Sequence, residues 1–558
     1  MLDKDVALKA AGLSSTELAD CVSVLWRLHE AEESGILDPN ANCLRPLRKI
    51  LSIHLHKTYS HLPQKSAIDE SERRRAEKDR KRERRQRQLE ADKRFQENSQ
   101  LRASRLAKLQ ALEEEDAGML KGQLRIPDGP SMEATCEGAE GEGGADEVEQ
   151  EYCRQQACYI CKVRFSERHH FYSHLCPACA SLNFEKRNQA RDLSGRTALV
   201  TGARVKIGFQ VATKLLRMGA RVLATTRFPQ DARKRYMAEP DAEQWLDRLQ
   251  IIGADFRFLA GVEAMCLQLR RREQYLDIIV NNACQTIRRP AAYYAHLLHE
   301  EAQPYPSLTR GPLLQLESSL AESLADEALS LPPSGMGSSA ALSQLLVLEE
   351  DRLKEEAVAL PAGARDVNGQ QLDLRSTNSW LLKLGEVETP EAVEVFCINA
   401  MAPFILNSRL RPLLESSPHP DRYVVNVSAM EGKFYRYKQP THPHTNMAKA
   451  ALNMMTRTSA EDMAMSSGIY MNSVDTGWIN DENPLPTAQR IAESHQFQTP
   501  IDEVDAAARI LDPVLGGMEA VASGYVMGRR PRKGAGVEER DSGPMWGCFL
   551  KDYKPTEW

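Results

Sequence analysis

Four cysteines form two closely spaced pairs near the middle of the chain. Cys158 and Cys161 make one Cys-x2-Cys pair, and Cys176 and Cys179 make a second one after fourteen intervening residues. Two such pairs can place four thiolates tetrahedrally around one Zn²⁺. We therefore predict a zinc site within a small module at residues 151–190.

Three histidines lie between the two cysteine pairs, and each could replace a thiolate. These are His169, His170 and His174. A closed four-sulfur site needs none of them and leaves no open coordination position, so we predict that the metal is structural rather than catalytic. The alternative is four unrelated buried cysteines, against which the paired spacing argues.

A glycine-bearing turn follows the first strongly apolar run after this module. Residues 197–202 read TALVTG, and the run KIGFQVATKLLRMGA follows at 206–220. A strand, a tight turn and a helix in this order can receive a pyrophosphate at the helix N-terminus. Such runs continue to alternate, which predicts a doubly wound, Rossmann-like parallel sheet flanked by helices. The expected strands are 196–202, 221–227, 249–256, 276–283, 422–429, 468–475 and 523–528.

The turn resembles the Thr-Gly-x3-Gly-x-Gly fingerprint of the short-chain dehydrogenase/reductase family. Lys206 stands at the middle glycine of that pattern, and either Lys206 or Arg204 could contact phosphate. The resemblance implies that a dinucleotide is held by this turn. The residues it assigns to the cofactor here are Thr201, Gly202, Arg204, Lys206, Ile207 and Gly208.

Residues after the later strands fit the same resemblance. A basic residue at Arg227, where an NAD-binding member would carry an acidic one, implies NADP. Asp255 is similar to the family's adenine-contacting aspartate. Asn282 and Ala283 match the Asn-Asn-Ala-Gly strand end, in which Cys284 replaces the glycine.

The segment after the strand at 468–475 resembles the family's Pro-Gly segment beside the nicotinamide amide. Gly477 is retained there, and Thr476 replaces the proline. Asp475, Asp481 and Glu482 make this rim acidic. We expect these carboxylates to pair with Lys or Arg from elsewhere in the chain, with a cationic substrate as the alternative.

The catalytic residues of the family have matches at all but one position. The resemblance implies that Asn399 holds a relay water, that Ser428 polarises the substrate oxygen, and that Lys449 binds the ribose and tunes the acid. Thr445 stands where the family's proton-donating tyrosine should be. An alkyl hydroxyl has a far higher pKa than a phenol, so Thr445 is a poor general acid near neutral pH.

A proton donor must therefore come from elsewhere if the chain turns over a substrate. The segment EGKFYRYKQPTHPH offers Tyr435, which we predict to be the stand-in, then Tyr437, with His442 or His444 as further alternatives. Two functions follow from the two outcomes. The first is an NADP-dependent oxidoreductase acting on a carbonyl or alcohol, and the second is a catalytically impaired, dinucleotide-binding interaction protein.

The remaining chain is predicted from its composition. Aromatic residues at 546–558 are expected to pack on the sheet domain or on a neighbour. The predicted parts are a small helical region at 1–66, a charged helix at 67–117, a disordered acidic linker at 118–150, the cysteine module at 151–190, and the sheet domain at 191–558 with an insertion at about 286–375.

The overall charge points to no class of partner. The chain has 72 basic and 78 acidic residues, a formal net charge of −6, and twelve cysteines. Its N-terminus has no secretory pattern, and no apolar stretch reaches the roughly 18 residues needed to span a bilayer, so we expect reduced thiols, a cytoplasmic location and no membrane. The basic stretch at 72–94 leaves a nuclear location and RNA binding open. We further expect a small-molecule substrate, and we leave open a protein partner at 67–117 and a homo-oligomer.

Overall fold

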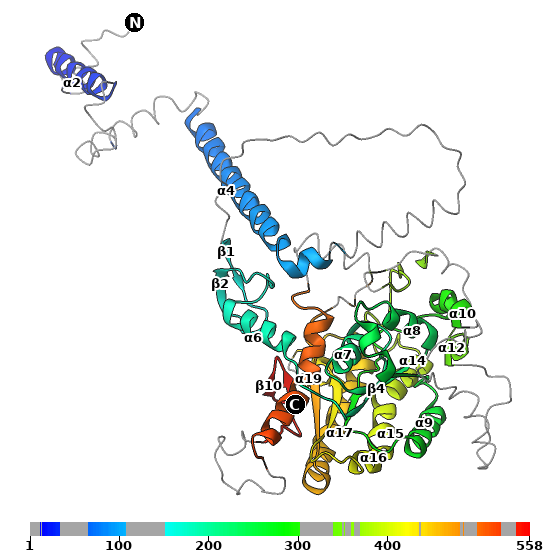
Figure 1. Cartoon of the computed structure of the whole chain (residues 1–558). Helices are drawn as coiled ribbons and strands as arrows, with labels where there is room; N and C mark the ends of the chain where they lie inside the picture. The colour runs from blue at the N-terminus through cyan, green and yellow to red at the C-terminus, as the bar shows by residue number, and fades with distance from the viewer. Residues whose placement is uncertain are drawn as a thin grey trace, which may run out of the picture. The chain divides into compact units, whose positions relative to one another are not determined.

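The computed structural model describes residues 14–33, 65–105, 151–301, 339–348, 369–434, 437–479, 499–525 and 543–558, with a few single positions between them (Figure 1). The chain divides into two compact units, Met1–Arg87 and Gln88–Trp558, which are described separately. The predicted acidic linker at 118–150 lies outside the described residues.

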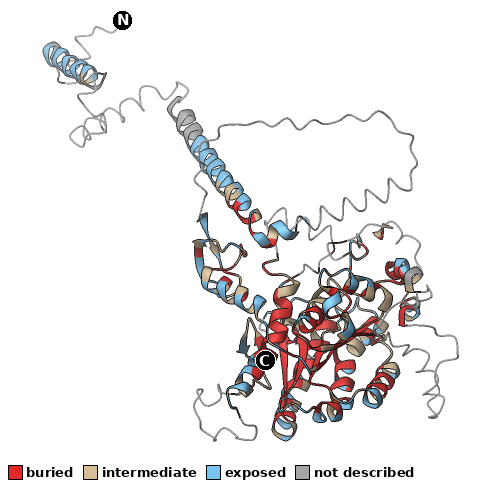
Figure 2. Cartoon of the chain, in the orientation of Figure 1, coloured by how far each residue is buried: buried red, intermediate tan, exposed pale blue. Residues whose placement is uncertain are grey.

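The first unit contains helix α2 (Ser15–Glu33) and most of helix α4 (Lys65–Glu97). The side chains at 74–87 of α4 are exposed (Figure 2). Lys81 and Glu77 form an ion pair at 2.8 Å with i,i+4 spacing, which contributes only a few tenths of a kcal/mol to an exposed helix. This part of α4 is a solvated charged helix.

The second unit is built around an eight-stranded sheet in the order β5-β4-β3-β6-β7-β8-β9-β10. Seven strands are parallel, and β10 pairs antiparallel with β9. The sequence-based prediction of a doubly wound parallel sheet is confirmed. The strands are β3 (Thr197–Val200), β4 (Arg221–Thr226), β5 (Leu249–Gly253), β6 (Ile278–Asn281), β7 (Arg422–Ser428), β8 (Ile469–Asp475), β9 (Phe549–Lys551) and β10 (Lys554–Thr556).

Helices cover both faces of the sheet because the apolar strands present side chains alternately to each face. In β3, Ala198 and Val200 join the core under α7 and α19, whereas Leu199 joins the core under α9 and α15. Figure 2 shows the buried sheet between these layers. The helices are α7 (Lys206–Arg217), α8 (Pro229–Met237), α9 (Leu259–Arg272), α10 (Ala295–Glu301), α12 (Ser339–Leu342), α14 (Thr389–Phe396), α15 (Ala402–Arg409), α16 (Arg411–Glu415), α17 (Pro443–Ser467) and α19 (Glu503–Ala522).

The end of the sheet differs from the sequence-based prediction. Ser523 and Gly524 form a turn after α19, and Tyr525 is not in a strand, while 526–528 lie outside the described residues. Strand β8 pairs with β7 on one side, and its partner on the other side is β9, from the aromatic tail. The tail thus supplies a parallel strand and a closing hairpin, because its apolar Phe549 and Leu550 are buried against the sheet edge.

One helical run, Thr389–Arg409, is long and apolar enough to cross a membrane by length and composition alone. It comprises α14, a π-helical turn at Cys397–Met401, and α15. Of its most apolar window, 56% is buried inside the unit, as in a core helix of a folded domain.

The cysteine module combines a short hairpin with a helix. Strands β1 (Glu151–Ala157) and β2 (Arg164–Glu167) pair antiparallel, and α6 (Pro177–Asn188) follows. The last turns of α4 belong to the same small core, where the Phe95 ring lies 5.0 Å from the Tyr152 ring and Asp92 accepts a hydrogen bond from the Cys153 amide at 2.7 Å.

Candidate active site and metal centre

The four cysteines of the module converge. The sulfur atoms of Cys158, Cys161, Cys176 and Cys179 all lie within 4.8 Å of one another. A tetrahedral site with metal–sulfur bonds of about 2.3 Å would place its sulfurs roughly 3.8 Å apart, and the Cys161 and Cys176 sulfurs are 3.6 Å apart. The donor set therefore fits a metal ion bound by four thiolates.

Local backbone contacts shape the first cysteine pair. The Cys158 amide donates to the Val163 carbonyl at 2.9 Å, and the Lys162 amide donates to the Cys158 carbonyl at 3.0 Å. A backbone hydrogen bond from Val163 lowers the pKa of the Cys161 thiol to about 7, whereas burial raises the pKa of the Cys179 thiol. A bound cation would favour the thiolate of both.

The three nearby histidines make other contacts. His169 accepts a hydrogen bond from the Phe171 amide at 3.1 Å, and a His174 ring nitrogen lies 2.9 Å from the Ser173 hydroxyl. Among the described residues, the metal-ligand cluster contains the four cysteines and no histidine.

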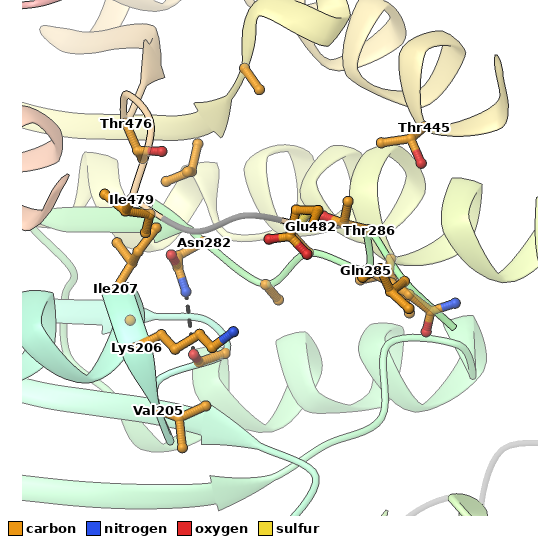
Figure 3. Close-up of a pocket in the computed structure, with 18 of the residues that line it drawn as sticks. Val205, Lys206, Ile207, Asn282, Gln285, Thr286, Thr445, Thr476, Ile479 and Glu482 are labelled. Carbon is orange, nitrogen blue, oxygen red and sulfur yellow. Dashed lines mark hydrogen bonds between the residues drawn. The ribbon is translucent and has the colours of Figure 1, made fainter. Parts of the chain in front are cut away.

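A second site lies at the carboxyl ends of the parallel strands, where open α/β sheets bind their ligands. A cavity of about 760 Å³ there is lined by residues that follow β3, β4, β6, β7 and β8. Lys206 and Thr445 lie on opposite sides of it, and Asn282 points toward the turn that carries Lys206 (Figure 3). The predicted cofactor residues that line it are Gly202, Arg204, Lys206, Ile207, Gly208, Arg227, Asp255, Asn282, Ala283, Lys449 and Gly477.

The turn between β3 and α7 is tied to the end of β6. The Asn282 side chain donates to the Thr201 carbonyl at 2.9 Å, and the Thr201 hydroxyl accepts from the Asn282 amide at 2.9 Å. Thr201 thus shapes the turn without lining the cavity. A Cβ at Gly208 would lie 2.3 Å from the Gly202 carbonyl oxygen. Lys206 adopts the left-handed φ of 53° that the glycine of the pattern would take.

The side of the cavity beside β4 is rich in arginine. Arg227 donates to the Tyr294 hydroxyl at 2.8 Å, and its guanidinium lies 4.5 Å from the centre of that ring. Arg204 lines the cavity but is buried in an ion pair with Asp231 at 2.6 Å. Arg227 is therefore the better placed of the two to receive an anionic group.

Asp255 lies beside the same arginines. Burial raises the pKa of its carboxyl, but hydrogen bonds from Arg257 and the charge of Arg227 hold that pKa below its ordinary value. Arg257 donates to it at 2.6 Å. Asp255 is therefore an ionised side chain in the wall of the cavity.

The insertion contributes cavity residues that the sequence reasoning missed. Arg289 lines the cavity, forms an ion pair with Asp373, and lies 5.1 Å from the centre of the Tyr293 ring. The one available signal was the run Arg288-Arg289 shortly after the Asn-Asn-Ala strand end. Other lining residues with polar or aromatic side chains that were missed include Tyr159, Tyr293, Tyr294, Asp366, Gln370, Trp380 and Lys551.

The predicted catalytic residues come from β7, α17 and the π-helical turn. Ser428, Thr445 and Lys449 line the cavity and are 3%, 2% and 4% exposed. The hydroxyls of Ser428 and Thr445 find no hydrogen-bond partner among the described residues, whereas the Lys449 amine donates to the Val427 carbonyl at 2.8 Å. Two buried, unpaired hydroxyls facing one cavity are the feature that a polar ligand atom would satisfy.

Asn399 contacts the cavity wall without lining the cavity. Its amide group accepts from the Gln285 backbone amide at 2.8 Å and donates to the Gln285 carbonyl at 3.0 Å. Gln285 lines the cavity, and Asn399 does not. Asn399 therefore fixes the strand end that follows β6.

The structure brings none of the described replacement donors to the cavity. Tyr435, the predicted stand-in, lies outside the described residues. Tyr437 is 78% exposed and does not line the cavity. His442 is stacked on Trp380 with ring centroids 3.8 Å apart, and His444 is buried 3.6 Å from Glu391, so both are packed outside the cavity wall.

One carboxylate of the acidic rim, that of Asp475, pairs with a lysine from elsewhere in the chain, as the sequence predicts. The Lys551 amine lies 3.3 Å from Asp475, at the register position beside it on β9. Burial lowers the pKa of Lys551, but Asp475 and neighbouring groups carry that pKa above its ordinary value. Glu482 lines the cavity, and Asp481 lies outside the described residues.

Comparisons with known proteins agree with this geometry. The family model of the short chain dehydrogenases matches residues 196–298. An uncharacterized protein of Acanthamoeba polyphaga mimivirus is 30% identical over 368 residues, which cover 64% of this chain and 71% of that protein. Retinol dehydrogenase 14 of Mus musculus is 32% identical over 102 residues, which cover 16% of this chain and 30% of that protein.

Solved structures of similar chains include two NADP complexes. A short-chain dehydrogenase from Burkholderia cenocepacia in complex with NADP aligns with a TM-score of 0.36 at 17% identity, covering 58% of this chain and 92% of that one. The Pseudomonas aeruginosa RhlG/NADP active-site complex aligns with a TM-score of 0.35 at 19% identity, covering 60% and 94%. The strand order, the turn after the first strand of the sheet and the matching family model together establish that this chain belongs to the short-chain dehydrogenase family.

Proposed function

We propose that the chain is an NADP-dependent oxidoreductase acting on a carbonyl or alcohol substrate. The observation that carries this proposal is one cavity, lined at one side by the turn after β3 and by Arg227, and at the other side by Ser428 and Lys449. A dinucleotide bound across the switch point of the sheet would reach from the first group to the second. When bound, the dinucleotide supplies or accepts the hydride.

The residues present suit the binding and orienting steps. Arg227 would present its guanidinium to a 2′-phosphate, and its contacts with Tyr294 would hold that orientation. The Ser428 hydroxyl is free to donate a hydrogen bond to a substrate oxygen. The Lys449 amine donates to the carbonyl of Val427, the residue that precedes Ser428 on β7. A charge-assisted hydrogen bond to a phosphate contributes about 1.5–3 kcal/mol, which corresponds to roughly 10-fold to 100-fold in affinity.

Cofactor selectivity tests the proposal. We expect NADPH to bind at least about 10-fold more tightly than NADH in calorimetry, and Arg227→Ala to remove most of that difference. Lys234→Ala is the matched control, since Lys234 is an exposed cation on the neighbouring α8 that does not line the cavity. Equal affinities of the wild type for NADPH and NADH would contradict the NADP assignment, and binding of neither would contradict the function.

A second function is favoured by one observation, the alkyl hydroxyl of Thr445 at the place of the family's phenol. Without a phenol beside Lys449, the chain would bind NADP and act as an interaction protein. Tight NADPH binding with no NADPH oxidation against a broad panel of aldehydes, ketones and quinones would favour this alternative.

The metal of the module is proposed to be zinc with a structural role. Four thiolates without an open position suit Zn²⁺ in this role, and two of the cysteines, Cys158 and Cys176, belong to a buried apolar core. Loss of the metal is therefore expected to unfold the module rather than to remove a reacting group.

A further inference from the structure

We propose that the cysteine module contributes to the cofactor cavity through Tyr159, which positions the loop that follows β8. This loop, Thr476–Ile479, is called the nicotinamide-side loop below. The inference rests on the proposed function, because it concerns how the second half of the dinucleotide is held. It makes Tyr159 a positioning residue contributed from outside the sheet.

The position of the loop decides which half of the cofactor it meets. The two halves of a doubly wound sheet each take one mononucleotide half of a dinucleotide. The glycine-bearing turn and Arg227 follow β3 and β4, so the adenosine half would lie over that side of the sheet. The loop follows β8, on the other side of the switch point, and it lines the same cavity.

Tyr159 makes a direct contact with this loop. Its hydroxyl accepts a hydrogen bond from the Trp478 backbone amide at 3.0 Å, and Tyr159 itself lines the cavity. The phenol oxygen also lies 3.7 Å from where a Cβ on Gly477 would stand. A single side chain of the module thus fixes the middle of the loop.

Two arginines, Arg187 of the module and Arg105 from the chain before it, hold residues 499–502 at the start of α19. Arg105 donates to the carbonyls of Thr499 and Ile501 at 2.9 and 2.7 Å. Arg187, at the end of α6, pairs with Asp502 at 2.6 Å, where α19 begins. Residues 499–502 are therefore held by Arg105 and by Arg187 of the module.

The cysteine cluster is what holds Tyr159 in place. Tyr159 lies between Cys158 and Cys161, and its amide donates to the His174 carbonyl at 2.9 Å. Cys158 and Cys176 also share one apolar core with Ile479 of the nicotinamide-side loop and with Ile501. Metal bound by the thiolates would fix the backbone on both sides of Tyr159, and through it the nicotinamide-side loop.

Tyr159→Phe tests this, because it removes the hydroxyl alone. The probes are NADPH and adenosine 2′,5′-bisphosphate, which carries the adenosine half and the 2′-phosphate but no nicotinamide. We expect the full-length variant to bind NADPH about threefold to tenfold more weakly, the effect of one hydrogen bond, and to bind the bisphosphate unchanged. Hydrogen exchange at the amides of Thr476–Ile479 should become faster in the same variant.

Tyr152→Phe is the matched control. Tyr152 is in the same module, and its hydroxyl donates to the Ser173 carbonyl at 2.7 Å, away from the cavity. Its loss should leave both ligands and the loop exchange unchanged, with metal content equal to that of the wild type in both variants. Wild-type NADPH affinity and loop exchange in Tyr159→Phe would overturn the inference, and so would parallel weakening of both ligands. If the wild type bound neither ligand, the proposed function would fail instead.

Discussion

Thr445→Tyr restores a phenol at the position where this chain departs most from its family. Thr445 is 2% exposed, lines the cavity, and stands one helical turn before Lys449 on α17. Its hydroxyl has no hydrogen-bond partner among the described residues, so the substitution breaks no hydrogen bond. The ring can extend into a cavity of about 760 Å³.

The size of the effect follows from the chemistry of the donor. Residues four apart share a helix face, so a phenol at 445 would lie beside the Lys449 amine, whose charge lowers the phenol pKa. A positioned general acid contributes about 10²-fold to 10⁴-fold. We expect a gain in kcat/KM of about 10²-fold, or ~2.7 kcal/mol of transition-state stabilisation, since the site is not adapted to this ring.

The assay is NADPH oxidation with aldehyde and ketone substrates, and Thr445→Phe is the control. The Phe variant adds the same ring without the hydroxyl, so the ratio of the two variants isolates proton donation from packing. NADPH affinity is measured for both, to show that the cofactor site is intact. Equal rates for the Tyr and Phe variants would refute the reasoning. A wild type already as fast as Thr445→Tyr would show that another group delivers the proton.

Two further predictions concern the metal and the insertion. Cys176→Ser should lower zinc content from about one ion per chain and reduce thermal stability, whereas Cys153→Ser, outside the cluster, should leave both unchanged by metal analysis and calorimetry. Burial raises the pKa of Glu301 from 4.5 to about 7, although the Gln230 and Asp231 amides donate to it at 3.0 and 3.1 Å. Between pH 4.5 and 7 the folded state therefore keeps a proton on Glu301 that the unfolded state loses, so the free energy of unfolding should fall as the pH rises through this range. We expect a fall of about 1 kcal/mol, because Glu301 is partly exposed. Glu301→Gln should flatten this pH dependence in thermal melting.

The sequence predicts those features of the fold that depend on short-range patterns. Alternating apolar strands and amphipathic helices specify the parallel sheet, because each strand must be covered on both faces. The spacing of Cys158, Cys161, Cys176 and Cys179 anticipates the sulfur cluster for a similar reason: a Cys-x2-Cys turn brings two sulfurs together locally.

Contacts between distant segments were not accessible in the same way. Tyr159 and Trp478 are 319 residues apart, and nothing in either segment's pattern specifies their hydrogen bond. Strand β9 has only three residues and lies among glycines and prolines, so its sequence carries a weaker strand signal than the longer apolar run at 523–528. Arg204 has the right position for a phosphate contact, but its pairing with Asp231 depends on how α8 packs.

The departures from the family pattern carry different weights for binding and for turnover. Gly202 and Gly208 are required by the backbone, since a Cβ would lie 2.9 Å from the Ala283 Cα in one case and 2.3 Å from a carbonyl oxygen in the other. Lys206 keeps the left-handed conformation of the glycine it replaces, at a cost of about 1–2 kcal/mol. The backbone shape of the turn between β3 and α7 therefore explains why Gly202 and Gly208 are present, and their presence says nothing about turnover. Thr445 lines the cavity, and a threonine in place of the family's tyrosine removes the phenol that would act as the acid. Whether the chain turns over a substrate therefore depends on which group donates the proton that the family's tyrosine, at position 445, would supply.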